Sequence, residues 1–113
     1  MTPNKAIEIV DSLKPNSYSE EDKLRWINEL DGMVQRLVFQ RKEDEVTQYA
    51  YPDDMHTELL IKAPFENVYA LYLEAKIDYH NREYGNYNNS AMMFESQYSE
   101  YKKAYIREHK AKG

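Results

Sequence analysis

The sequence predicts an all-α fold, a small four-helix bundle with a long loop between helices two and three. Three observations predict it. Apolar residues recur at helical spacing in four segments, capping residues and turn signals bound those segments, and the last connection is short enough for an antiparallel helical hairpin. A length of 113 residues is typical of one domain, so residues 1–113 are interpreted as a single helical unit.

The first helix is expected to begin at Pro3, with Thr2 as its N-cap, and to end at Lys14-Pro15-Asn16. Ser19 is expected to cap the second helix, whose first turn is acidic. The predicted buried faces are Ala6, Ile9, Val10 and Leu13 in the first helix, and Trp26, Ile27, Leu30, Met33, Val34, Leu37 and Val38 in the second.

Pro64 is expected to open the third helix, and Gly85 to end it before Asn86 caps the fourth, which runs to about His109. Residues at intervals of four and three predict one narrow face of the fourth helix, which we interpret as the inside of the hairpin. This buried stripe consists of Tyr87, Ala91, Phe94, Tyr98, Tyr101 and Tyr105.

The third helix is apolar over most of its circumference, which is typical of a buried helix. Its side away from the fourth helix carries Ala70, Leu73 and Ile77. Either the first two helices cover this side or another subunit does. Because the third helix is rich in tyrosine, which is enriched at interfaces, we include this side in the candidate interaction surface.

Residues 41–63 break the helical pattern, and long loops inside small domains are usually functional. The loop contains more acidic than basic residues, with Arg41, Lys42 and Lys62 as its cations. Its acidic residues form the second part of the candidate interaction surface: Glu43, Asp44, Glu45, Asp53, Asp54 and Glu58. Because Asp53 and Asp54 are expected in a solvated turn, their removal should change the melting temperature little.

The formal charge of −5 lies in one half of the chain. Residues 1–64 hold 8 basic and 13 acidic residues, whereas residues 65–113 hold 7 of each. An acidic chain is poorly suited to non-specific nucleic-acid binding, although an acidic wall suits a channel through which DNA must slide. The absence of cysteine fits a reducing compartment, and no segment resembles a signal peptide or membrane span.

No residue pattern predicts catalysis, a cofactor or a metal site. Asp53, Asp54, His56 and Glu58 are close in sequence but match no known ligand spacing, so a solvated turn is the better interpretation. Glu74 and Asp78 lie one helical turn apart and are interpreted as a solvated strip rather than an acid–base pair.

About half of the chain carries a familiar pattern. It comprises YPDDM (Tyr51–Met55), Glu58–Phe65 with its ELL and APF elements, YLEAKIDY (Tyr72–Tyr79) and YNNSAMMF (Tyr87–Phe94). This pattern resembles small proteins from the head-morphogenesis region of tailed phages and prophages of Gram-positive bacteria. We interpret these as similar to the siphophage head–tail connector proteins, also called adaptor or head-completion proteins.

The resemblance implies a virion structural protein, made in the host cytoplasm and located in the virion neck. Such subunits form a homo-oligomeric ring under the portal protein, let DNA pass passively, and contact head-completion or tail proteins. No membrane, small-molecule substrate or cofactor is implied, and no binding residue can be transferred individually. Two alternatives remain open: a small helical interaction module, such as a phage-encoded regulator of a host protein, and a metal-dependent helical-bundle enzyme.

Overall fold

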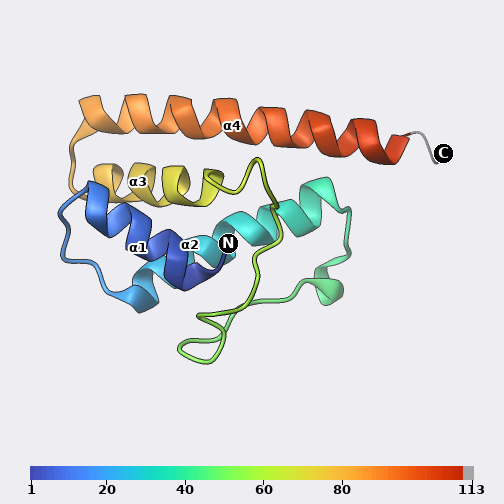
Figure 1. The fold of residues 1–113 in the computed structure, drawn as a ribbon, viewed down its shortest axis with the longest axis horizontal. Coiled ribbons are helices and arrows are strands. Elements are labelled where there is room, and N and C mark those ends of the chain that lie inside the picture. Colours follow the sequence, from blue (N-terminus) through green and yellow to red (C-terminus); the bar gives the residue numbers. More distant parts are fainter. Residues whose placement is uncertain (111–113) are drawn as a thin grey trace.

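The computed structural model describes residues 1–110, and all regular structure within them is helical, as predicted. The elements in chain order are α1 (Pro3–Leu13), α2 (Glu20–Met33), the π-helical turn η1 (Val34–Val38), the 3₁₀ turn η2 (Glu43–Glu45), α3 (Val68–His80) and α4 (Tyr84–Lys110). Helix α3 occupies the middle of the bundle, with α4 along one side and α1 and α2 on the other (Figure 1).

The two predicted N-caps are confirmed. The hydroxyl of Thr2 accepts a hydrogen bond from the backbone N–H of Lys5 at 3.2 Å, and Pro3 stands at the first helical position of α1. The hydroxyl of Ser19 accepts a hydrogen bond from the N–H of Asp22 at 3.0 Å. These side chains satisfy N–H groups that have no partner within the first turn of a helix.

Both hairpin boundaries differ from the prediction. Residues 64–67 form hydrogen-bonded turns, and α3 begins at Val68 instead of Pro64. At the other end, Arg82 adopts a left-handed conformation (φ 60°) and α4 begins at Tyr84, so Gly85 lies inside its first turn and is not a C-cap. The N–H of Glu83 donates to the carbonyl of Asp78 at 2.9 Å and closes the turn without a glycine.

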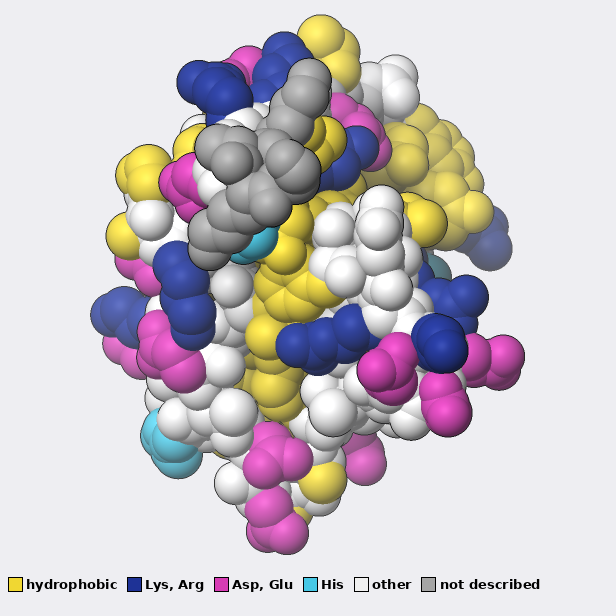
Figure 2. Space-filling model, turned by 90° about the vertical axis from the view of Figure 1, so that its right-hand side faces the viewer, with side chains coloured by type: hydrophobic (Ala, Val, Ile, Leu, Met, Phe, Trp, Pro, Cys, Tyr) yellow, Lys and Arg dark blue, Asp and Glu magenta, His cyan; other side chains and the backbone are white. Residues whose placement is uncertain are grey.

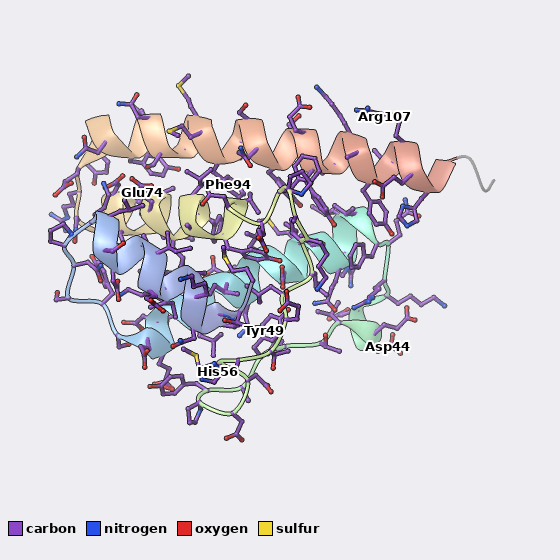
Figure 3. The ribbon with its side chains drawn as sticks, in the orientation of Figure 1. Asp44, Tyr49, His56, Glu74, Phe94 and Arg107 are labelled. Atoms are coloured by element: carbon purple, nitrogen blue, oxygen red, sulfur yellow. The ribbon has the colours of Figure 1, made fainter. Side chains whose placement is uncertain are left out.

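The buried stripe on α4 packs against α3 as predicted. Phe94, Tyr98 and Tyr101 are buried, and Figure 3 shows Phe94 directed from α4 towards α3. Tyr72 of α3 lies 5.0 Å from Phe94 between ring centroids. Because α4 has 27 residues and α3 only 13, its second half extends past α3, where Tyr105 contacts Phe39.

The other side of α3 is covered by α1 and α2. Leu73 and Ile77 have no exposed surface and Ala70 is 4 % exposed. The prediction that these three residues belong to an interaction surface is therefore wrong for the folded chain. The first two helices supply the cover that the sequence left open, through Ala6, Ile7, Val10, Leu24, Ile27 and Leu30. Leu13 and Leu37, expected in the core, are instead exposed.

A buried ion pair joins α1 to the hairpin. Asp78 is fully buried, which corrects the expectation of a solvated Glu74–Asp78 strip. The ammonium group of Lys14 lies 2.5 Å from one Asp78 oxygen, and the hydroxyl of Ser90 donates to the other at 2.8 Å. Burial is tolerated because both carboxylate oxygens have partners.

Candidate functional site

Polar side chains of α2 and of η1, which continues it, hold the loop of residues 41–63 against the bundle. The side-chain amide of Asn28 exchanges two hydrogen bonds with the backbone of Tyr49, at 2.8 and 3.0 Å. Gln35 does the same with Thr47, where both distances are 2.9 Å. Each amide therefore pairs with the loop as a neighbouring peptide group would, and the loop backbone has a defined position instead of being a loose connection.

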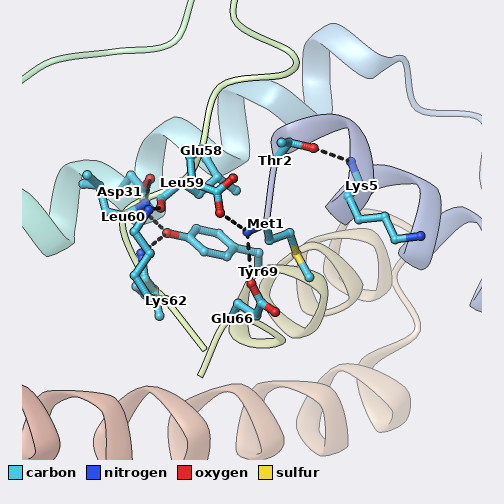
Figure 4. Close-up of polar contacts among 11 residues, drawn as sticks. Met1, Thr2, Lys5, Asp31, Glu58, Leu59, Leu60, Lys62, Glu66 and Tyr69 are labelled. Carbon is cyan, nitrogen blue, oxygen red and sulfur yellow. Dashed lines mark hydrogen bonds and ion pairs between the residues drawn. The ribbon is translucent and has the colours of Figure 1, made fainter. Parts of the chain in front are cut away.

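Asp31 is the centre of this attachment. Its carboxylate accepts hydrogen bonds from the hydroxyl groups of Tyr49 at 2.5 Å and Tyr69 at 2.6 Å. The N–H of Ile61 donates to the Tyr69 hydroxyl at 2.8 Å, which links α2, the loop and α3 through one tyrosine (Figure 4). With 1 % of its surface exposed, Asp31 contacts no solvent-borne substrate and is best explained as a structural anchor.

Burial determines the protonation behaviour of this cluster. Desolvation raises the pKa of Asp31 despite the hydrogen bonds from Tyr49 and Tyr69, which favour its charged form. Burial, together with the neighbouring Asp31 charge, also raises the pKa of Tyr69, so its hydroxyl remains a donor at physiological pH.

Apolar packing also attaches the loop to the bundle. Three loop residues, Met55, Leu59 and Ile61, are buried in the hydrophobic core.

The predicted acidic residues divide between separate places. Glu43, Asp44 and Glu45 form the exposed turn η2, whereas Asp53 and Asp54 stand in the turn that follows Tyr51. Glu58 lies apart from both groups: the Met1 amino group donates to it at 2.7 Å, and this hydrogen bond lowers the pKa of Glu58. Figure 3 shows Asp44 and His56 on the side of the molecule away from α4.

His56 stands among three acidic loop residues, Asp53, Asp54 and Glu58, that are candidate metal ligands by type. Within residues 1–110, no three His, Asp or Glu side chains are placed to hold a metal ion together. Asp54 accepts a hydrogen bond from the N–H of Ala50 at 2.7 Å, which gives it a local role in the turn. His80 stacks on Trp26 with ring centroids 5.3 Å apart. No helix in the described part of the chain is long and apolar enough to cross a membrane.

A tyrosine-rich groove lies between α3 and α4. It encloses about 470 Å³ and is lined by Tyr72, Ala75, Lys76, Tyr79, Tyr87, Ala91, Phe94 and Glu95. Tyr79 contacts both Tyr84 and Tyr87, at centroid distances of 6.4 and 5.4 Å. Tyr79 and Tyr84 remain more than half exposed, so their rings are available to a partner.

The groove also has fixed charges. Lys76 pairs with Glu29 at 2.9 Å, and the Tyr72 hydroxyl donates to the same carboxylate at 3.0 Å. Tyr87 was predicted to lie inside the hairpin, whereas Lys76 and Glu95 were not predicted to line a groove. The available signal was spacing: Lys76 follows Tyr72 by four residues and Glu95 follows Ala91 by four, and residues four apart share one side of a helix.

A second apolar hollow lies at the end of the molecule where α4 extends past α3. It encloses about 250 Å³, and Phe39, Phe65, Tyr101, Tyr105 and His109 are among its lining residues. Figure 2 looks onto this end and shows exposed apolar surface between Lys and Arg side chains, with acidic side chains nearby. Both hollows are rich in tyrosine and phenylalanine, a composition typical of protein contact surfaces.

The chain matches no family model, and searches of curated proteins and of solved structures find no match.

Proposed function

We propose that this protein is a structural subunit of a tailed-phage or prophage virion, a head–tail connector that assembles under the portal and helps to form the DNA channel. One observation carries the proposal. The acidic turn η2 and the turn of residues 51–56, which contains Asp53 and Asp54, lie on the side away from α4 (Figure 1), and hydrogen bonds from α2 and η1 hold the intervening loop. A connector subunit needs such a fixed surface, separate from its lateral contacts.

Charge and composition support an assignment of roles to the two sides. An acidic wall repels phosphate groups and keeps passing DNA from adhering, which suits η2 for the channel or its rim. The tyrosine-rich groove suits protein contact, since tyrosine rings bury large apolar areas while their hydroxyls tolerate water before assembly. The proposal assigns no catalytic residue, cofactor, metal or small-molecule substrate.

Association with the portal protein encoded in the same genome tests the proposal directly. The two proteins are co-expressed, and the mass of the native complex is measured. We expect a complex in which several copies of this chain bind one portal ring. Absence of any such complex, with the chain instead forming a tight complex with a host protein, would overturn the connector assignment in favour of a regulatory interaction protein.

Charge reversal tests the proposed role of the acidic turn. A ring of the Glu43→Lys/Asp44→Lys variant should retain double-stranded DNA at low salt, whereas a wild-type ring should not. The matched control is Glu8→Lys/Glu100→Lys, which makes the same charge change at two other exposed positions. Equal DNA retention by both variants would contradict a channel location for η2.

A further inference from the structure

A second stripe on α4 lies one residue along from the buried stripe, about 100° around the helix, and flanks it. It consists of Asn88, Met92, Glu95, Ser99, Lys102 and Ile106, and we call it the outer stripe. These residues share one side of the helix because they recur at intervals of four and three. Met92 is 71 % exposed and Ile106 is 59 % exposed, so a solvent-facing helix side carries two large apolar side chains.

The outer stripe is complementary to itself when its direction is reversed. Ser99 stands at its centre, with Met92 seven residues before it and Ile106 seven residues after it. Charge follows the same arrangement: Glu95 precedes Ser99 by four residues, and Lys103, at the edge of the stripe, follows by four. A surface of this kind fits a second copy related by a two-fold axis, because each half meets its complement.

The surface beside Met92, and the ion pairing of Glu95 and Lys103, agree with a two-fold contact. An open hollow of about 570 Å³ is lined by Asn88, Ala91, Met92 and Glu95, next to the exposed part of the stripe. Among the side chains of residues 1–109, Glu95 belongs to no ion pair, and Lys103 makes only an exposed contact of 3.5 Å with Glu100. Both charges are therefore available to a partner.

We propose that two copies of the free protein associate through their outer stripes as an antiparallel pair. Ser99 lies on the two-fold axis, Ile106 of one copy packs at the hollow beside Met92 of the other, and Glu95 faces Lys103 across the contact. This inference goes beyond the connector function and does not depend on it. A contact along one helix is small, below about 1,200 Å² in total, so the pair should dissociate on dilution.

Disulfide trapping tests the two-fold axis. The chain has no cysteine, so Ser99→Cys introduces a single thiol, which meets its own counterpart in the proposed pair. Gln97→Cys is the matched control, because Gln97 is exposed and lies two residues away, on the opposite side of the helix. We expect rapid dimer formation under mild oxidation only for Ser99→Cys. Equal rates for both variants, or no Ser99→Cys dimer, would overturn the proposal.

Charge exchange tests the register without any cross-link. Glu95→Lys and Lys103→Glu should each lower the dimer fraction in sedimentation experiments, while the double variant should regain it because the pair of charges is only inverted. Arg107→Glu is the control for added negative charge on the same helix outside the outer stripe. A double variant as dissociated as the singles refutes the register, and a wild-type chain that is monomeric throughout refutes the pair. Portal binding is measured separately, so neither result bears on the connector assignment.

Discussion

Tyr69→Phe should destabilise this protein more than its loss of one oxygen atom suggests. The hydroxyl of Tyr69 donates to Asp31 and accepts from the N–H of Ile61, and the ring is fully buried. Loss of a hydrogen bond to a charged group costs about 1.5–3 kcal/mol, and a buried N–H left without a partner costs about 1–3 kcal/mol. We therefore expect a loss of about 3–5 kcal/mol in the free energy of unfolding, a large share of a typical domain's stability.

The matched control is Tyr49→Phe. Its hydroxyl also donates to Asp31, but the side chain is only half-buried and the hydroxyl supports no backbone N–H. This variant should lose about 1–2 kcal/mol, because one charge-assisted hydrogen bond is removed where water can enter. A clear difference between the two tyrosines isolates the contribution of the Ile61 N–H.

Urea unfolding followed by fluorescence measures both changes, since Trp26 is the single tryptophan and is buried. Amide hydrogen exchange at Ile61 should accelerate in Tyr69→Phe before the helices unfold, because the loop is released first. A Tyr69→Phe loss below about 1 kcal/mol, or one equal to that of Tyr49→Phe, would refute the assignment of Tyr69 as the link between loop and bundle.

Three further predictions concern charge. Lys14→Met should cost about 3 kcal/mol in urea unfolding, because Asp78 stays buried without its cation, and full stability in this variant would contradict the ion pair's role. Asp53→Ala should leave the melting temperature nearly unchanged. Asp54→Ala should lower the free energy of unfolding by about 1 kcal/mol, because the hydrogen bond from the Ala50 N–H is lost. Equal effects of the two variants would show that this hydrogen bond is unimportant. The raised pKa of Asp31 means that the folded state binds the Asp31 proton more tightly than the unfolded state does. The contribution of Asp31 to the free energy of unfolding therefore falls as pH rises from the unfolded pKa to the folded pKa. Asp31→Asn should remove this component from the dependence of stability on pH, and an unchanged dependence would refute it.

The helices were predictable where local signals agree. Caps at Thr2 and Ser19 and the periodic stripe on α4 depend on side chains within one or two turns, and the structure confirms them. The start of α3 was predicted wrongly because Pro64 is equally compatible with a turn. Gly85 was assigned as a cap because glycine tolerates left-handed geometry, yet Arg82 adopts that geometry instead.

The candidate interaction surface was predicted less well, for a different reason. Ala70, Leu73 and Ile77 are apolar whether another subunit or the protein's own helices cover them, so composition could not distinguish these outcomes. The tyrosine-rich groove combines residues of α3 with Glu95 of α4, and only the packing of the hairpin brings them together.

The sequence by itself determined the helical class, two helix starts and the face that α4 turns towards α3, because periodicity and capping act over a few residues. Only the tertiary structure decided that residues 41–63 are a fixed surface. Asn28, Asp31 and Gln35 appear in sequence as ordinary polar positions of an amphipathic helix, and their partners lie up to 38 residues away. Such pairings depend on how the whole chain packs, and here they convert a charged loop into a rigid part of the molecule.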